Sequence, residues 1–304
     1  MRGPAIGAIG GALLLAGCAS APAEVATAPA PPAAPPPAPA APAPAPTEAA
    51  KPPVALQYLY GSPEAAAAVR ATNARIADYG VWRIKQRPKD SVVLAPGAGM
   101  EAPTFEPCGK KPFAAVFDAD ETLIWNLGPM RYFAEKGTAF DPKVWDQWEK
   151  TGVGKAIAMP GTVEMVNRLR AAGITVIANT NRTAANAKGS EDTLRAAGLG
   201  EFKHGETLFL MGDDAGGSSK DPRRAAIAAK YCVIILGGDQ LGDFSQQFNA
   251  RDLPAATRMA LATGPAAAAL WDKGWFLFPN PVYGPWEKLG WDDAFPSDKQ
   301  WEPN

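Results

Sequence analysis

The sequence predicts an α/β fold in which helices flank a mostly parallel sheet, with a small helical cap added to it. From residue 113 onward, short apolar runs alternate with segments of helical pattern, and the links between them are short. This alternation is typical of βα units, which build parallel sheets. Residues 54–304 are long enough for one such core and a small accessory domain.

The N-terminal residues predict an export signal. Arg2 precedes a Gly-, Ala- and Leu-rich run at residues 5–16, which is too short to span a bilayer. The run ends in Leu15-Ala-Gly-Cys18, which resembles the lipobox of bacterial lipoproteins. The resemblance implies that residues 1–17 are a signal peptide and that Cys18 carries lipid such as palmitate. The alternative is an ordinary cleaved signal with a chance cysteine.

Ala19 follows the predicted lipid-bearing cysteine, and a residue other than Asp there implies sorting to the outer membrane, facing either the periplasm or the cell surface. Residues 18–53 are then almost wholly Ala and Pro. Such a tract cannot bury a core and favours extended conformations. We interpret it as a semi-rigid linker, and binding to peptidoglycan or to a partner remains an alternative.

The composition excludes several classes of function. The formal net charge is −1 and the basic residues are scattered, which argues against binding of a nucleic-acid polymer. His204 is the single histidine, so a His-rich zinc site and a phosphohistidine mechanism are both excluded. We expect His204 to lie at the surface.

A helix is expected first, because Ser62 is a good N-cap, Pro63 is a good first helical residue, and Pro88 prevents extension beyond about residue 85. Residues 89–112 contain turn residues and are expected to form a loop. The remaining expected elements are strands at 113–118, 174–178, 208–210, 232–236 and about 275–278, and helices at about 162–172, 190–197, 222–231 and 254–262.

Residues 123–159 lie between the first strand and the next α/β unit and are expected to form the cap. This insertion is dense in aromatic residues: Trp125, Tyr132, Phe133, Phe140, Trp145 and Trp148. Rings over a site could stack on flat substrates. The alternative is that they form the small core of the cap itself.

Polar clusters follow the strands or open the helices along the chain. They are Asp118 with Asp120, Thr180 with Asn181, Lys220, and Asp239 with Asp243. Adjacent parallel strands would bring these clusters together at one edge of the sheet. A hydroxyl and a lysine bind phosphate oxygens, three carboxylates suit Mg²⁺, and a carboxylate can act as nucleophile. The set predicts phosphoryl transfer through an aspartyl-phosphate.

These motifs resemble those of the haloacid dehalogenase (HAD) superfamily of phosphatases, which have a Rossmann-like core. The sequence around these motifs resembles that of the class C acid phosphatases, the bacterial lipoprotein e family, over about residues 57–290. The matching stretches are Leu59-Tyr-Gly-Ser-Pro-Glu64, Phe117-Asp-Ala-Asp-Glu-Thr122, Thr180-Asn-Arg182, Gly238-Asp-Gln-Leu-Gly-Asp-Phe244 and Pro279-Asn-Pro-Val-Tyr-Gly-Pro-Trp286. The resemblance implies a Mg²⁺-dependent acid phosphatase that is lipid-anchored at the outer membrane.

The resemblance also implies roles for the catalytic residues. Asp118 would attack phosphorus, and Asp120 would protonate the leaving oxygen and later deprotonate water. Thr180 would hydrogen-bond the phosphoryl group, with an amide from Asn181. Lys220 would neutralise the charge of the nucleophile and of the transition state.

One Mg²⁺ per chain would be held by the Asp118 carboxylate, the Asp120 backbone carbonyl and Asp239. Asp243 would orient Lys220 or a metal-bound water. Gln240 stands where the family often has Asn, which leaves open how Asp239 is held. Glu121 is expected to support the site from behind, and Arg182 is expected to be an ordinary loop charge.

The expected substrates are small phosphate monoesters, with nucleoside 5′-monophosphates or aromatic phosphates favoured. Trp125, Tyr283 and Trp286 are the rings expected to contact a flat leaving group. Two other functions remain open: phosphotransfer to an alcohol, and a cell-envelope interaction protein that uses the fold only as a scaffold.

Cys108 and Cys232 remain once Cys18 is set aside. An exported protein is in an oxidising compartment, where an even pair of cysteines suggests a disulfide. If the strands leading to Asp118 and Asp239 are neighbours, both cysteines lie near one end of the sheet. A bridge and two buried thiols are the two alternatives.

Overall fold

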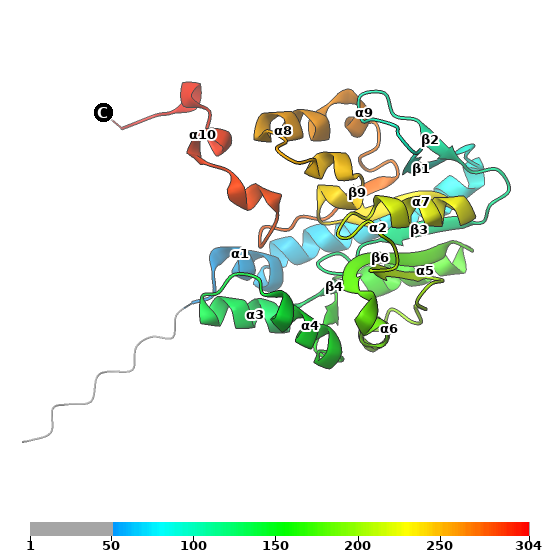
Figure 1. The fold of residues 1–304 in the computed structure, drawn as a ribbon, viewed down its shortest axis with the longest axis horizontal. Helices are drawn as coiled ribbons and strands as arrows, with labels where there is room; N and C mark the ends of the chain where they lie inside the picture. The colour runs from blue at the N-terminus through cyan, green and yellow to red at the C-terminus, as the bar shows by residue number, and fades with distance from the viewer. Residues whose placement is uncertain (1–50, 304) are drawn as a thin grey trace, which may run out of the picture. The chain divides into compact units, whose positions relative to one another are not determined.

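The computed structural model describes residues 51–303, and Figure 1 shows their arrangement. The predicted signal peptide, Cys18 and nearly all of the Ala/Pro linker therefore lie outside the described residues. Within residues 51–303, no helix is both long enough and apolar enough to cross a bilayer.

A five-stranded parallel sheet forms the centre of the fold, in the order β7-β6-β3-β8-β9. Its strands are β3 (Phe113–Phe117), β6 (Thr175–Thr183), β7 (Leu208–Met211), β8 (Cys232–Gly238) and β9 (Trp275–Leu277). The predicted α/β fold with a parallel sheet is thus confirmed. Because β3 is the middle strand, the loop after it lies between the loops that follow β6 and β8.

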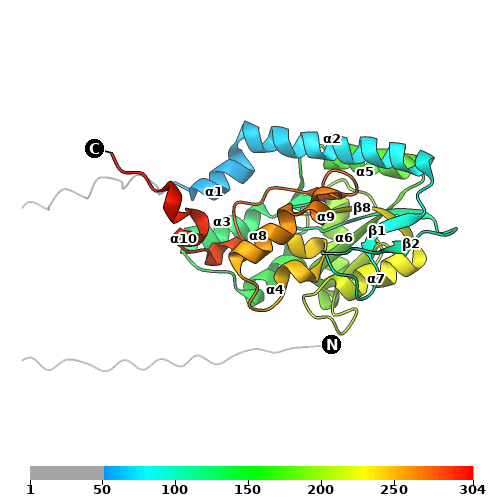
Figure 2. The same cartoon turned by 90° about the horizontal axis from the view of Figure 1, so that it is seen from above.

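The two faces of the sheet are covered by different layers, as Figure 2 shows from above. On one face, Ala115 and Phe117 of β3 pack in a core with α2 (Pro63–Gln86) and α5 (Thr162–Ala171). On the other face, Ala114 and Val116 pack in a second core with α7 (Asp221–Lys230) and β1 (Asp90–Leu94). Successive side chains of a strand point to opposite faces, so the buried run of β3 supplies both cores.

Residues 89–112 differ from the sequence expectation, because they are not only a loop. β1 pairs antiparallel with β2 (Phe105–Pro107), and Val92 and Val93 are buried. The Nε1 of Trp275 donates a hydrogen bond of 2.8 Å to the carbonyl oxygen of Val92. The short apolar run of β1 is thus stabilised by a contact with β9 that is distant in sequence.

The segment 123–159 forms the expected helical insertion. It begins with β4 (Ile124–Trp125) and ends with β5 (Ile157–Ala158), which pair antiparallel at its base. Between them lie α3 (Leu127–Lys136) and α4 (Pro142–Thr151). The short ribbon of β4 and β5 therefore joins the two cap helices to the loop after β3.

The remaining elements connect these layers. They are α1 (Val54–Leu56), a π-helical turn at Gln57–Gly61, α6 (Ala187–Ala196), α8 (Ala255–Thr263), α9 (Pro265–Ala268), α10 (Trp291–Ala294), and 3₁₀ turns at Ala184–Asn186, Leu241–Asp243, Gln246–Asn249, Pro285–Lys288 and Ser297–Lys299.

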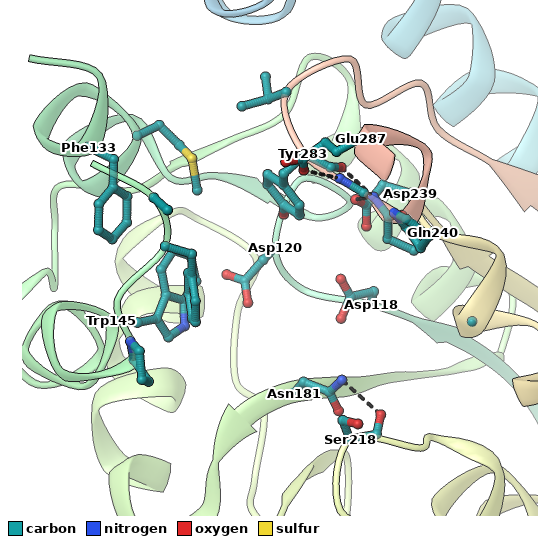
Figure 3. Close-up of a pocket in the computed structure, with 18 of the residues that line it drawn as sticks. Asp118, Asp120, Phe133, Trp145, Asn181, Ser218, Asp239, Gln240, Tyr283 and Glu287 are labelled. Carbon is teal, nitrogen blue, oxygen red and sulfur yellow. Dashed lines mark hydrogen bonds between the residues drawn. The ribbon is translucent and has the colours of Figure 1, made fainter. Parts of the chain in front are cut away.

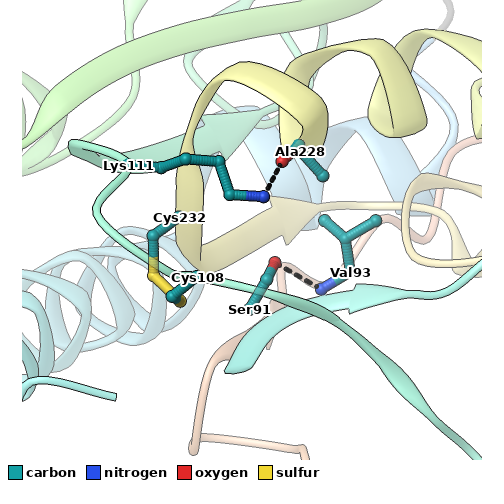
Figure 4. The surroundings of a disulfide bond; sticks show 6 residues. All are labelled: Ser91, Val93, Cys108, Lys111, Ala228 and Cys232. Atoms are coloured by element: carbon teal, nitrogen blue, oxygen red, sulfur yellow. Dashed lines mark hydrogen bonds between the residues drawn. A yellow bond between two sulfur atoms is a disulfide. The ribbon is translucent and has the colours of Figure 1, made fainter. Parts of the chain in front are cut away.

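Cys108 and Cys232 are joined by a disulfide at the amino end of β8, as Figure 4 shows. The two Cα atoms are 4.5 Å apart, and both residues are buried. Phe113 pairs with Cys232 in the register of β3 and β8, so these strands are neighbours. The bridge lies at the end of the sheet opposite to the loop that carries Asp118.

Candidate active site

A tight turn after β3 places the two aspartates. The backbone N–H of Asp118 donates to the carbonyl oxygen of Gly237 at 2.9 Å, which continues the pairing of β3 with β8. The chain then turns back, with the N–H of Leu123 bonded to the oxygen of Ala119 at 2.9 Å. Glu121 adopts a left-handed conformation in this turn, with φ of 52°. Asp118 and Asp120, with only Ala119 between them, thus have carboxylates that face different neighbours.

The four predicted clusters meet in one cavity of about 940 Å³ at the carboxyl ends of the strands. Figure 3 shows Asp118 and Asp120 between the cap residues Phe133 and Trp145 on one side and Tyr283 with Asp239 on the other. The predicted residues that line this cavity are Asp118, Asp120, Thr180, Asn181, Lys220, Asp239, Asp243 and Tyr283.

Lys220 is the N-cap residue immediately before α7 and is only 6% exposed. Its ammonium group pairs with Asp118 and also donates to Oδ1 of Asp243 at 2.7 Å. Burial alone would lower the pKa of Lys220, but the two carboxylates outweigh burial and raise it. Lys220 therefore stays charged beside Asp118, and Asp243 holds it there.

Asp118, Asp239 and Asp243 form a buried acidic cluster whose carboxylate oxygens lie within 4.8 Å of one another. Burial raises the pKa of Asp118 even though Lys220 is adjacent to it. Burial and then the charge of Asp243 raise the pKa of Asp239 to about 7. Three carboxylates with one lysine have excess negative charge, and such oxygens are the donors that a divalent cation such as Mg²⁺ prefers.

Asp239 is held by side chains from three parts of the chain. Thr122 donates to its Oδ1 at 3.2 Å, and Gln240 and Asn280 donate to its Oδ2 at 2.9 and 2.8 Å. Gln240 also donates to the carbonyl oxygen of Tyr283 at 3.0 Å. The glutamine therefore orients Asp239 directly and ties it to the turn that carries Tyr283.

Comparison with known proteins agrees with this geometry. A family model described as HAD superfamily, subfamily IIIB (acid phosphatase) matches residues 60–286. The chain belongs to this acid phosphatase family. It is therefore a phosphoric monoester hydrolase.

Solved structures share the fold. The class C acid phosphatase from Bacillus anthracis with tungstate bound has a TM-score of 0.57 and 22% identity, with 77% of this chain and 85% of that chain covered. A second structure of the class C acid phosphatase from Bacillus anthracis has a TM-score of 0.56 and 22% identity, with coverages of 79% and 90%. Both share the fold of this chain, in agreement with the Rossmann-like core.

Arg182 of the phosphatase is not the ordinary loop charge expected from the sequence. It is 1% exposed, and its Nε and Nη2 donate to Oδ1 of Asp120 at 2.9 and 2.7 Å. β6 continues to Thr183, so Thr180 and Arg182 are both buried while Asn181 between them is exposed. Residues two positions apart on a strand point to the same face, and this spacing was the signal that could have placed Arg182 beside Thr180.

Asn126 connects Asp120 to the cap. Its Nδ2 donates to Oδ1 of Asp120 at 2.9 Å. Its Oδ1 accepts from Arg182 and from Nε1 of Trp148 in α4, both at 2.9 Å. The sequence did not single out Asn126, because its partners come from three separate segments. The carboxylate of Asp120 is thus fixed by the cap and by β6, away from the acidic cluster.

Thr180 and Asn181 lie at the cavity in different ways. Thr180 Oγ1 is 3.4 Å from Oδ2 of Asp120. The side chain of Asn181 donates to the carbonyl oxygen of Ser218 at 2.9 Å and accepts from Arg223 at 2.6 Å. Its side-chain amide is therefore engaged with the segment that leads to Lys220, as Figure 3 shows for Ser218.

Glu121 links two distant segments behind the catalytic loop. Tyr60 donates to its Oε1 at 3.0 Å and Tyr283 donates to its Oε2 at 2.7 Å. The backbone N–H of Asn126 also donates to Oε1 at 2.8 Å. Burial and then the charge of Asp120 raise the pKa of Glu121 to about 7. The expected supporting position of Glu121 is what the structure shows.

Two rings expected at the substrate lie outside the cavity wall. Trp125 is buried, with its ring edge-on to Tyr60 at 5.8 Å. Trp286 is partly exposed, but it does not line the cavity. Trp125 belongs to β4, so its ring packs at the base of the cap. The large apolar side chains of the cap that do line the cavity are Met130, Phe133, Phe140 and Trp145.

His204 lies outside the cavity wall. Its Nε2 is 2.7 Å from Oδ1 of Asp213, and its side chain is partly exposed. This position agrees with the surface location expected for the single histidine of the chain.

Proposed function

We propose that this phosphatase is Mg²⁺-dependent and hydrolyses monoesters with flat leaving groups, such as nucleoside 5′-monophosphates or aromatic phosphates, through an aspartyl-phosphate on Asp118. The observation that carries the proposal is the pairing of buried Asp118 with Lys220 in a cavity that Asp120 also lines. A phosphoryl group bound in this cavity would then be within reach of a nucleophile, a positive charge and a proton carrier.

The donor set fits the metal. Asp118 and Asp239 would hold Mg²⁺ through their carboxylates, with the backbone carbonyl of Asp120 as expected from the family. Asp243 belongs to the same acidic cluster, but its Oδ1 accepts from Lys220 and its Oδ2 accepts from the backbone N–H of Gln240 at 2.9 Å. When bound, the cation would offset the charge of the acidic cluster and of the phosphate.

In the first step, an Asp118 carboxylate oxygen attacks phosphorus as the bond to the leaving oxygen breaks. Asp120 donates a proton to that oxygen, so the alcohol leaves neutral. Lys220 stabilises the charge on the phosphoryl oxygens. Thr180 supplies a hydroxyl donor, and the backbone N–H of Asn181 supplies a second one, because the side chain of Asn181 is already engaged.

In the second step, water attacks the phosphorus of the aspartyl-phosphate. Asp120, now a carboxylate, takes a proton from that water, and the bond between Asp118 and phosphorus breaks. Inorganic phosphate forms and Asp118 returns to its starting state. Arg182 and Asn126 keep the Asp120 carboxylate oriented through both transfers.

The cavity wall supports the proposed substrate class. Phe133, Phe140 and Trp145 of the cap offer ring surfaces, and Tyr283 faces the cavity from the C-terminal turn. Stacked or edge-on aromatic contacts add affinity for a flat leaving group.

We extend the proposal to the location of the enzyme, which would be anchored at the outer membrane by lipid on Cys18. The test is to label cells that express wild type or Cys18→Ser with a radioactive palmitate analogue. We expect label on the wild-type protein and none on the variant.

The deciding experiment combines one variant with a panel of esters. Wild-type protein is assayed for phosphate release from adenosine 5′-monophosphate, p-nitrophenyl phosphate and a sugar phosphate, with Mg²⁺ and with EDTA. We expect Mg²⁺-dependent release, a preference for the two flat leaving groups, and no turnover by folded Asp118→Asn. Turnover by that variant would exclude Asp118 as nucleophile.

A further inference from the structure

The segment that joins the Ala/Pro linker to the enzyme forms part of the cavity wall. Pro53, Ala55 and Leu56 line the same cavity as Asp118 and Lys220. The family match begins at residue 60, so these three residues lie upstream of the shared region. Figure 1 shows α1 beside the cap helix α3, from which Met130 and Phe133 also line the cavity.

The wall segment is attached to the core immediately after Leu56. Leu59 is fully buried, and the ring of Tyr60 packs edge-on against Trp125. Tyr60 also donates to Glu121, which accepts from Tyr283 through its other oxygen. One carboxylate therefore holds both the C-terminal turn and the residue four positions after Leu56, which anchors the wall segment at its C-terminal end.

We propose that Ala55 and Leu56 are specificity-determining residues that contact the leaving group of the substrate. The inference rests on the proposed function, since it concerns the substrate class of the same site. Pro53, Ala55 and Leu56 carry no charge and no side-chain hydrogen-bond donor, whereas Asp118, Lys220 and Asp239 belong to the polar part of the cavity. A leaving group with a flat apolar part reaches this wall, and a small hydrophilic leaving group gains nothing from it.

The test compares two substrates in full-length protein. The ratio of kcat/KM for adenosine 5′-monophosphate to that for glycerol 1-phosphate is measured for wild type and for Leu56→Ser. We expect the ratio to fall by about tenfold, mainly through a higher KM for the nucleotide, because an apolar contact in a pocket contributes on this order. Leu56→Met keeps the apolar volume and should retain the ratio.

Val54→Ser is the matched control, because Val54 is 80% exposed in the same short helix and does not line the cavity. It should leave the ratio within about twofold of wild type. Tyr60→Phe removes the hydrogen bond to Glu121 while keeping the ring, and should lower the ratio by about threefold.

The outcomes separate the two proposals. If wild type hydrolyses both esters and Leu56→Ser leaves the ratio unchanged, the inference is overturned and the phosphatase proposal stands. If the ratio falls as far in Val54→Ser as in Leu56→Ser, the inference is also overturned, because the effect would then not come from contact with the cavity wall. If wild type fails to hydrolyse the nucleotide, the proposed substrate class is overturned, and the inference with it.

Discussion

Asp118 and Asp120 are two residues apart in sequence, yet their carboxylates have opposite surroundings. Asp118 is 9% exposed and pairs with Lys220 inside a cluster of acids. Asp120 faces Arg182, Asn126 and the hydroxyl of Thr180. The turn at Ala119 separates the two groups, so one can attack phosphorus while the other transfers a proton.

This division predicts how Asp120→Asn behaves. The amide cannot transfer the proton, so kcat should fall by about 10²- to 10⁴-fold for an ester of a poor leaving group such as glycerol 1-phosphate. The fall should be smaller for p-nitrophenyl phosphate, whose leaving oxygen needs no proton. Steady-state kinetics with both esters measure the difference, and an equal loss for both would argue against Asp120 as the proton donor.

The buried pair of Arg182 with Asp120 makes a second prediction. Arg182→Ala leaves the Asp120 carboxylate without its cation, and removing one partner of a buried pair costs about 3–5 kcal/mol of unfolding free energy. Urea denaturation measures this loss. The control is Arg168→Ala, whose pair with Asp78 is solvent-exposed and should be worth less than about 1 kcal/mol. Similar losses in both variants would contradict the prediction.

For single residues, the sequence identified those at the ends of strands or the starts of helices, but not those that reach the site from other segments. Asp118, Lys220 and Asp239 follow from strand ends and helix starts. Asn126 contacts Asp120 in the same loop but also Arg182 in β6 and Trp148 in α4, so its place at the site depends on how the cap packs against β6. Trp125 was predicted to contact the substrate only because it is aromatic, but its position in β4 buries its ring at the base of the cap.

Among the elements, the sheet strands were predictable because each is a buried apolar run, and the antiparallel β1 and β2 were not. Asp90–Leu94 is short and lies among turn residues, and its burial depends on contacts with β9 and with the second core. The cap helices were predicted as an insertion, but the pairing of Ile124–Trp125 with Ile157–Ala158 that closes it depends on contacts far apart in sequence.

The disulfide between Cys108 and Cys232 gives a prediction about the sheet. The bridge spans a sequence separation of 124 residues, and loss of a native disulfide costs about 2–5 kcal/mol. The double variant Cys108→Ser, Cys232→Ser should therefore unfold at lower urea concentration. Its kcat/KM should stay near that of wild type, because the bridge lies at the amino ends of the strands, away from Asp118.

Thiol titration of the unfolded, non-reduced protein checks the same bond in wild type. No titratable thiol should come from Cys108 or Cys232 in protein made in an oxidising compartment. Two reactive thiols from this pair would show that the cysteines are buried but not bridged, and any stability loss in the double variant would then reflect the burial of two hydroxyl groups and not the loss of a cross-link.

The whole molecule brings side chains from several distant parts of the described chain to one edge of the sheet. The order β7-β6-β3-β8-β9 makes β3, β6 and β8 neighbours, so Asp118, Thr180 and Asp239 lie toward the same edge of the sheet, as the alternation of strands and helices predicts. The sequence could not predict that Glu121 would join Tyr60 from upstream of the core to Tyr283 from its C-terminal turn. That contact links the two ends of the domain across the site.

The acidic cluster predicts that Mg²⁺ stabilises the whole fold as well as supporting turnover. Burial and mutual repulsion raise the pKa values of Asp118 and Asp239, so the folded protein without cation holds unfavourable negative charge. A cation that binds only the folded state adds about 2.7 kcal/mol when present at a hundred times its Kd. Thermal unfolding in EDTA and in excess Mg²⁺ should therefore show a higher Tm with the metal.

Two variants make this prediction specific to the cluster. Asp239→Asn removes one carboxylate from the cluster, so its Tm should rise much less with Mg²⁺ than that of wild type. Asp213→Asn changes an acid that pairs with His204 outside the cavity wall, so its Tm should respond as wild type does. A response of equal size in all three proteins would mean that Mg²⁺ stabilises the fold at another place, and the acidic cluster would lose its assignment as the metal site.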